Sequence, residues 1–148
     1  MKKTSKSIRV TGIYRIGKSS GVHLPVYVSK VPAGFPSPAD DFVEQKLSLD
    51  EHFIRNRAAT FIVKVSGDSM LGAGIHPGDH LIVDRSLEAL DRRVVVAALD
   101  GELVVKRIRR RSGRLYLESE NPGFSPIEVG DASEFSVWGV VTYVIHRL

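Results

Sequence analysis

A dense series of short apolar segments occupies residues 58–147 and most strongly limits what this chain can fold into. Apolar and polar residues alternate along TFIVKVS (60–66), which is typical of a strand with one buried face. Farther along, RVVVAAL and ELVVKRI flank Asp100-Gly101, a strong signal for a two-residue β-hairpin. The other expected strands are HLIVD (80–84), RLYLES (114–119), SPIEV (125–129) and FSVWGVVTYVIHRL (135–148). This spacing predicts a mainly β protein with a compact, curved, antiparallel fold.

One or two short helices are expected ahead of these strands. Ser37 and Pro38, followed by two acidic residues, have the composition of a helix start, and this helix is expected to end near Lys46. Ser48 and Glu51 have the spacing of a capping box, which predicts a second short helix.

Positive charge is concentrated at the amino-terminal end. The net charge is +4, yet residues 1–33 contain seven Lys or Arg residues and no acid, and Asp40 is the first acidic residue. Such an arm is either a solvated extension or a contact for an acidic partner or nucleic acid. The chain has no cysteine, which excludes a disulfide scaffold and thiol catalysis. No apolar run is long enough to span a membrane.

Inside this arm, the segment GIYRIGKS from Gly12 to Ser19 fits the Walker A pattern of nucleotide-binding proteins. A working P-loop needs a helix directly after the pattern, because the helix N-terminus faces the phosphates. Gly21 and Pro25 follow instead and favour an irregular or extended chain. The sequence therefore predicts no nucleotide site, and no cofactor is expected.

A turn with the sequence GDSM follows the 60–66 strand. Gly67 allows a sharp bend, which places Ser69 at the end of a rigid element with backbone N–H groups nearby. Such groups can stabilise an oxyanion. Most serines in Gly-Asp-Ser turns are ordinary turn residues, so this turn indicates a nucleophile only together with a second feature.

That second feature is a lysine in the predicted hairpin. Alternation along ELVVKRI places Val104, Lys106 and Ile108 on one face. A lysine between two aliphatic residues is either buried or extends its ammonium group from an edge strand into water. If it is buried, its pKa falls, and neutral lysine can accept the proton of a serine hydroxyl.

Taken together, SGDSM and GELVVKRI, with Lys106 following Ser69 by 37 positions, resemble the LexA/UmuD family of self-cleaving Ser/Lys peptidases (peptidase S24). Four other segments carry the same resemblance: AGFPSPADDFVEQKLSLDEHFI, GIHPGDHLIVD, NPGFSPIEV and VWGVVTYVI. It extends over about residues 33–147 and implies the curved β-fold of the LexA and signal-peptidase type.

The resemblance also implies a cleavage site and a division of the chain. Family members are cut within their own chain between a small residue and glycine, and here Ala33–Gly34 offers that bond. Residues 1–33 would then be an arm removed by self-cleavage, and residues 34–148 would form the mature Ser/Lys peptidase-like domain. Side chains this small let the backbone approach a nucleophile closely.

The same resemblance assigns the catalytic roles. Ser69 would be the nucleophile and Lys106 the general base. The backbone N–H groups of Ser69 and Asp68 would form the oxyanion hole. No metal is implied at this site.

The implied biology is mutagenesis in the SOS response to DNA damage. Cleavage would be stimulated by a filament of RecA on single-stranded DNA. The processed homodimer would act in the cytoplasm as an accessory subunit of an error-prone translesion DNA polymerase of the UmuC type. Neither a membrane nor a specific DNA sequence is an expected partner.

Two alternatives remain at this point. One is a signal-peptidase-like enzyme that cuts in trans, although such enzymes need a membrane anchor. The other is a LexA-like or phage-type self-cleaving transcriptional regulator. A regulator of that kind needs an amino-terminal helix-turn-helix, for which residues 1–33 are short and interrupted by glycine.

Two further patterns have simpler interpretations. His76, Asp79 and His80 in HPGDH superficially match a metal-binding H-x-x-E-H motif, but that motif needs a helix and Pro-Gly predicts a turn. Spacing alone also allows a Ser69–His pair. The basic run KRIRRRSGR (106–114) is either a solvated strand end or a nucleic-acid contact.

Overall fold

The computed structural model describes residues 7–17, 23–27, 43–130 and 133–148. Two compact units divide the chain. The larger consists of Met1–Ile16 together with Asn56–Leu148, and the smaller of Gly17–Arg55.

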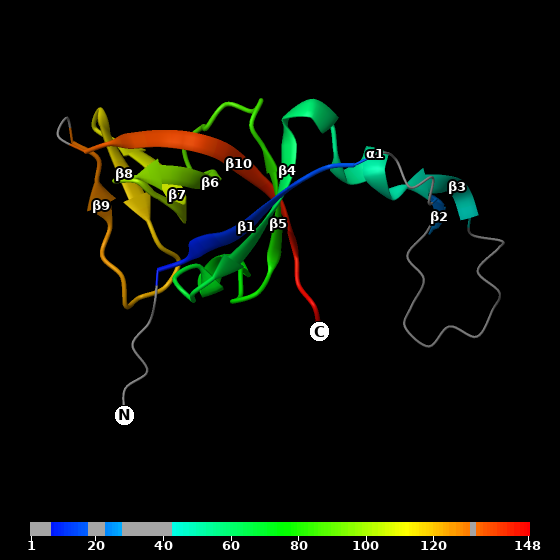
Figure 1. The fold of residues 1–148 in the computed structure, drawn as a ribbon, viewed down its shortest axis with the longest axis horizontal. Helices are drawn as coiled ribbons and strands as arrows, with labels where there is room; N and C mark the ends of the chain where they lie inside the picture. Colours follow the sequence, from blue (N-terminus) through cyan, green and yellow to red (C-terminus); the bar gives the residue numbers. More distant parts are fainter. Residues whose placement is uncertain (1–6, 18–22, 28–42, 131–132) are drawn as a thin grey trace. The chain divides into compact units, whose positions relative to one another are not determined.

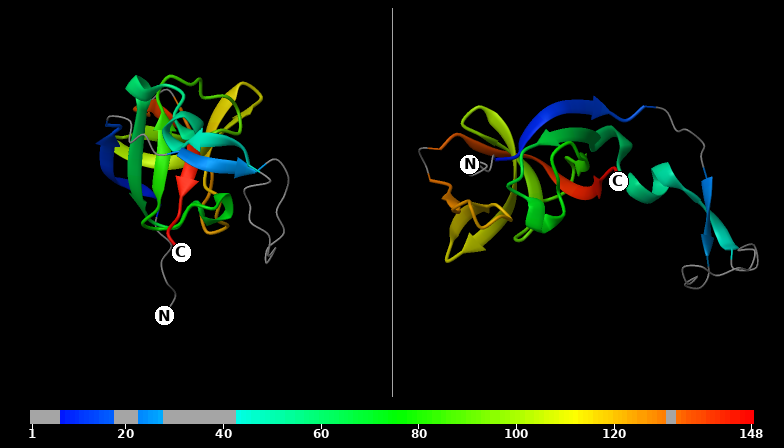
Figure 2. Two further views of the ribbon diagram at one scale, coloured as in Figure 1. Left: turned by 90° about the vertical axis from the view of Figure 1, so that its right-hand side faces the viewer. Right: turned by 90° about the horizontal axis from the view of Figure 1, so that it is seen from below.

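The larger unit is built on an eight-stranded sheet (Figure 1). In spatial order its strands are β1 (Arg9–Arg15), β4 (Thr60–Ser66), β5 (His80–Asp84), β10 (Phe135–Ile145), β6 (Val94–Leu99), β7 (Glu102–Arg111), β8 (Arg114–Glu118) and β9 (Ile127–Glu128). All pairings among these strands are antiparallel. Arg9 of β1 also lies opposite Val104 of β7, so the sheet curls until β1 reaches β7. Figure 2 shows this curvature in β1 and β10. The predicted mainly β, curved antiparallel fold is confirmed.

Two clusters of buried apolar side chains pack against the strands. Val63 and Val65 of β4 belong to the first cluster, as the alternation of that strand predicts. In β7, Val105 belongs to the first cluster, whereas Val104 and Ile108 belong to the second. Both faces of this part of β7 are therefore covered, which explains why its sequence is nearly all apolar around Lys106.

The predicted hairpin joins β6 to β7. Asp100 has a φ of +49° and Gly101 a φ of +83°. Positive φ at both central residues is the geometry that a two-residue type I′ turn requires. The turn sets a register in which Val95 lies opposite Lys106.

The smaller unit pairs β2 (His23–Tyr27) with β3 (Val43–Ser48), which leads into α1 (Leu49–Phe53). The short helix predicted after Ser48 is confirmed. The helix expected to end near Lys46 is wrong in its described part, because Val43–Ser48 form a strand, and its start lies outside the described residues. Pairing with β2 gives this segment backbone hydrogen-bond partners, which outweighs a helix signal from local sequence. No helix in the described ranges is long and apolar enough to cross a membrane.

The amino-terminal strand β1 was not expected from sequence. Its residues, RVTGIYR, pair with β4, from Arg9 opposite Ser66 to Arg15 opposite Phe61. The first residues of the P-loop match, Gly12–Arg15, lie in this strand, and Lys18 and Ser19 lie outside the described residues. Part of the basic arm is therefore a strand of the main sheet.

Candidate functional site

The turn that carries Ser69 leaves the end of β4 abruptly. Gly67 has a φ of +91°, a conformation that favours glycine, and it redirects the chain as predicted. Ser69 and Met70 are both fully buried. Met70 fixes the turn, because its carbonyl accepts hydrogen bonds from Ala73 and Ile75 at 3.0 and 3.2 Å. A short 3₁₀ helix, Leu71–Ala73, follows directly.

The hydroxyl of Ser69 contacts the amino-terminal segment. Ile8 donates its backbone N–H to Ser69 Oγ at 2.9 Å. The Ile8 side chain is fully buried in the first apolar cluster. The backbone carbonyl of Ile8 accepts a hydrogen bond from the Val105 N–H at 3.4 Å. Ile8 therefore fills the space between the Ser69 turn and β7.

Open space remains beside the contact between Ile8 and Ser69. A surface hollow of about 570 Å³ is lined by Ser7, Arg9, Ser66 and Gly67. Two of these residues flank Ile8 in the amino-terminal segment, and the other two precede Ser69 at the end of β4. The site is thus open to solvent beside Ile8, although Ser69 itself is covered.

Lys106 lies in the interior of β7 with 3% of its surface exposed, so of the two alternatives for this lysine the structure supports burial. Its Nζ donates a hydrogen bond to Ser119 Oγ at 2.7 Å and lies 5.4 Å from the centre of the Phe124 ring. Burial lowers the pKa of Lys106 from its ordinary value of 10.5, because an ammonium group is poorly solvated there. The side chain thus has the property that a lysine base needs.

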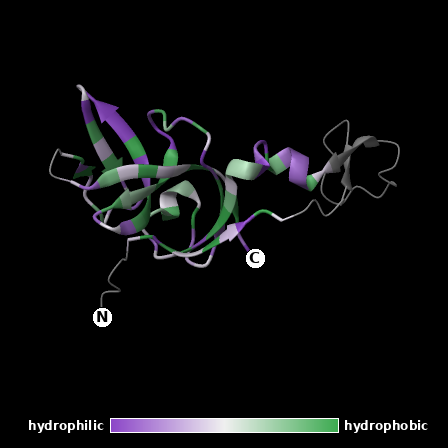
Figure 3. Cartoon of the chain, turned by 45° about the horizontal axis from the view of Figure 1, so that its top comes forward, coloured by the Kyte–Doolittle hydropathy of each residue, from purple (hydrophilic) through white to green (hydrophobic). Residues whose placement is uncertain are grey.

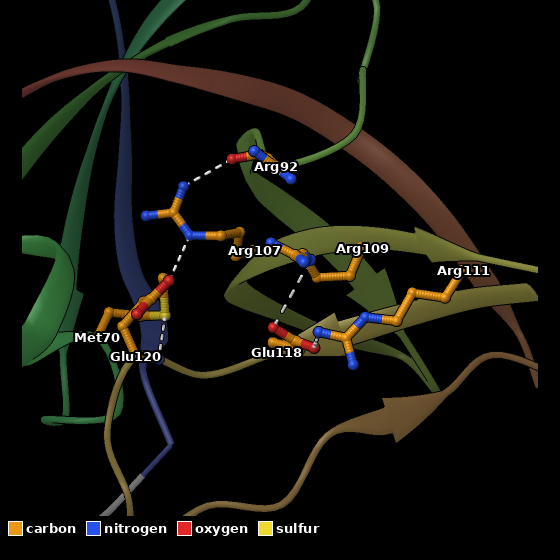
Figure 4. A network of polar contacts seen from close by, with 7 residues as sticks. All are labelled: Met70, Arg92, Arg107, Arg109, Arg111, Glu118 and Glu120. Carbon is orange, nitrogen blue, oxygen red and sulfur yellow. Dashed lines mark hydrogen bonds and ion pairs between the residues drawn. The ribbon is translucent and has the colours of Figure 1, made fainter.

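One short segment after β8 joins the Ser69 turn to Lys106. Ser119 contacts Lys106, while the next two residues contact the turn. Glu120 donates its N–H to Met70 Sδ at 3.4 Å (Figure 4) and accepts the Gly72 N–H at its carbonyl at 2.8 Å. Asn121 Nδ2 donates to the Asp68 carbonyl at 3.0 Å. Residues 119–121 therefore hold the two halves of the site together.

Glycine is required where this segment meets the turn. A Cβ added at Gly72 would lie 2.8 Å from the Glu120 carbonyl oxygen, closer than real Cβ contacts allow. The contact of residues 119–121 with the turn therefore depends on a residue without a side chain. Sequence reasoning singled out neither Ser119 nor Gly72, since both act only through a neighbour distant in sequence.

The predicted site residues are only partly brought together. Within the described residues, Ser69 and Lys106 share no hydrogen bond, and each is bonded to another partner, Ile8 and Ser119 respectively. The backbone N–H of Ser69 has no acceptor among those residues. The expected cleavage site, Ala33–Gly34, lies outside the described residues.

The basic run on β7 is largely matched by acids. Hydrophilic residues gather on the β7–β8 hairpin (Figure 3). In Figure 4 the Arg107 guanidinium pairs with Glu120, while Arg109 and Arg111 approach Glu118 at 4.0 and 3.0 Å. Because these guanidinium groups face carboxylates on neighbouring segments, the pairing favours the solvated strand-end interpretation over a nucleic-acid contact.

The sequence is also similar to proteins of a known family. Residues 25–142 match the family described as Peptidase S24-like. Protein SamA of Salmonella typhimurium is 40% identical over 123 residues, covering 83% of this chain and 85% of that protein. Protein MucA of the same organism is 41% identical over 133 residues, covering 88% and 90%. The LexA repressor of Bordetella parapertussis is 40% identical over 118 residues, covering 80% of this chain and 54% of the repressor.

Proposed function

Because this chain belongs to the Peptidase S24-like family, we propose that it is a self-cleaving serine peptidase with Ser69 as nucleophile and Lys106 as general base. The observation that carries the proposal is the state of Lys106. It is an almost fully buried lysine with a lowered pKa, held through residues 119–121 to the turn that carries Ser69. A lowered pKa favours the neutral amine relative to an ordinary lysine, and the neutral amine can remove the serine proton.

The proposed reaction is acyl transfer. Ser69 Oγ attacks the carbonyl carbon of Ala33, and Lys106 Nζ takes the hydroxyl proton. The backbone N–H groups of Ser69 and Asp68 stabilise the negative charge on the carbonyl oxygen. The bond to Gly34 then breaks, and its amine leaves with the proton from Lys106. Water activated by the same lysine hydrolyses the ester and restores Ser69.

In the described arrangement the nucleophile is blocked. The Ile8 N–H occupies a lone pair of Ser69 Oγ, and Ser69 is fully buried. A cleavable segment therefore reaches Ser69 only after Ile8 has left, which gives self-cleavage a conformational step before the chemistry. Cutting at Ala33–Gly34 would separate residues 1–33, including Ile8, from the rest of the chain and would let Ile8 leave Ser69 permanently.

The cellular role we propose is SOS mutagenesis, because SamA and MucA are UmuD-like proteins. A RecA filament on single-stranded DNA favours the arrangement in which Ile8 is released and Ala33–Gly34 is presented. The processed chain then acts as a cytoplasmic homodimer with an error-prone polymerase of the UmuC type.

The similarity to the LexA repressor supports a second candidate, a self-cleaving transcriptional regulator. A gel-shift assay on duplex DNA separates the two roles. Binding to one specific sequence at physiological salt would support the regulator, and the absence of sequence-specific binding would favour the mutagenesis role.

Intact mass tests the proposed cleavage. The full chain is incubated with RecA, ATP and single-stranded DNA, with a sample lacking the DNA as its control. We expect a new species that begins at Gly34. An unchanged mass, with circular dichroism showing a folded protein, would contradict the proposed function, and a product that begins elsewhere would contradict the assigned bond.

Ser119 is expected to position the base. Ser119→Ala removes the acceptor of the Lys106 Nζ hydrogen bond, so we expect cleavage to slow by roughly tenfold, a part of what general-base catalysis contributes. The Ser119 hydroxyl stabilises the charged ammonium form of Lys106 more than the neutral amine. Its loss therefore lowers the pKa of Lys106 and also moves the midpoint of the pH–rate profile to lower pH. Ser119→Thr should retain both properties. The exposed Ser125→Ala is the control, and an unmoved pH profile in Ser119→Ala would argue against the role.

A further inference from the structure

Three side chains that commonly bind metal meet on the larger unit. They are His76 and Asp79 in the turn before β5, and His146 just after β10. One ligating atom from each lies within 4.8 Å of the others. His146 Nδ1 is 2.6 Å from Asp79 Oδ1, and His76 Nδ1 is 3.8 Å from Asp79 Oδ2. The two imidazole rings lie 4.6 Å apart between centroids.

Strand pairing explains how residues so distant in sequence come together. Ile145 of β10 lies opposite His80 of β5 in an antiparallel register. The next residue outward on each segment is His146 on one side and Asp79 on the other. The predicted turn at Pro77 is confirmed, and it returns His76 to the same position.

The carboxylate is already fixed in place. Asp79 is only 3% exposed, and its Oδ2 accepts the backbone N–H of His76 at 2.8 Å. The two histidine side chains are 48% and 42% exposed. The ring of His76 has no hydrogen bond to any described residue. A buried carboxylate is therefore flanked by two imidazoles whose outer sides face water.

We propose that His76, Asp79 and His146 bind one Zn²⁺ ion. Zinc favours imidazole nitrogen and carboxylate oxygen at about 2.0–2.2 Å, so ligands around one tetrahedral ion lie about 3.4 Å apart. The observed separations of 2.6 and 3.8 Å lie on either side of this value. Zinc replaces the hydrogen bond between His146 and Asp79, whose Nδ1 and Oδ1 atoms move apart from 2.6 Å to bind the ion, and water completes the coordination. Nitrogen ligands disfavour Mg²⁺, which prefers oxygen.

This assignment changes how HPGDH is interpreted. The helical motif with His76, Asp79 and His80 was rejected from sequence because Pro77-Gly78 predicts a turn, and the structure has that turn. The tertiary structure supplies His146 in place of His80. The site links the loop that begins at the Ser69 turn to the end of β10, so a bound ion would brace both segments.

Calorimetric titration of the EDTA-treated full chain with zinc chloride tests the proposal. We expect one zinc per chain and no heat of binding from magnesium chloride. His76→Asn and His146→Gln should each weaken zinc binding by at least about tenfold. Mutating a residue that only hydrogen-bonds to a metal ligand already lowers metal affinity by about that factor, and these two residues are ligands themselves. Both side chains are partly exposed, so both variants are expected to fold.

His52→Gln is the matched control, because His52 lies in α1 of the other unit, and it should leave zinc binding unchanged. In NMR spectra, zinc should shift the ring signals of His76 and His146 and leave those of His52 in place. Absence of stoichiometric binding, or equal loss of affinity in the His52 and His146 variants, would overturn the assignment. The test does not depend on peptidase activity, so it is separate from the proposed function.

Discussion

Replacing Ser69 with alanine is expected to abolish self-cleavage, with a fall in rate of more than about a thousandfold, as for the loss of a peptidase nucleophile. No other group takes over, because the reaction needs an oxygen nucleophile on this turn. The measurement is the fraction of intact chain over time, followed by mass under conditions in which the wild type is processed.

The same variant is also expected to be less stable. Alanine leaves the buried Ile8 N–H without its acceptor at Ser69 Oγ, which costs about 1–3 kcal/mol in the free energy of unfolding. Ser125→Ala is the matched control, since Ser125 is an exposed serine that does not line the hollow beside Ser69. Normal cleavage in Ser69→Ala, or equal loss in Ser125→Ala, would contradict the role assigned to Ser69.

Replacing Lys106 with methionine is expected to abolish cleavage while leaving the fold intact. Methionine has a similar length and suits the apolar surroundings of β7, but it cannot accept a proton. Lys64→Met, at an exposed position on β4, is the control and should be processed normally. Processing of Lys106→Met at the wild-type rate would show that another group is the base.

The pH dependence of Lys106 has a definite sign. Burial lowers the pKa of Lys106 in the folded protein, whereas the unfolded chain keeps the ordinary value of 10.5. Between these two values the unfolded state binds more protons, so the free energy of unfolding rises with pH through that window. The wild-type cleavage rate should rise with pH as well, because the neutral amine is the active form. Lys106→Met should lose this rise in stability, which urea unfolding at several pH values would measure.

Local sequence predicted most of the sheet and the two central site residues. Alternation identified β4, short apolar segments identified the later strands, and Asp100-Gly101 located the hairpin, because side-chain patterning and turn chemistry act within a few residues. The position of Lys106 between Val104 and Ile108 pointed to burial, and the structure decided between burial and an exposed ammonium group. Such features depend on neighbours in the same strand, so sequence alone reveals them.

Features that join distant segments were not predicted. The strand β1 was taken for a solvated arm, because RVTGIYR has a mixed pattern and gains its hydrogen bonds only from β4. The contact of Ile8 with Ser69 and the support of Lys106 by Ser119 were missed for the same reason. The helix expected before Lys46 failed because pairing between β2 and β3 overrode a local capping signal.

By itself, the sequence determined the mainly β fold, the sharp turn that carries Ser69 and a lysine at position 106 with apolar neighbours. These are set by side-chain periodicity and turn residues, which act over short distances along the chain. Only the tertiary structure decided that Ile8 contacts the Ser69 hydroxyl and that His146, not His80, joins His76 and Asp79. Strand register fixes such contacts, and register depends on how whole strands bury their apolar faces together.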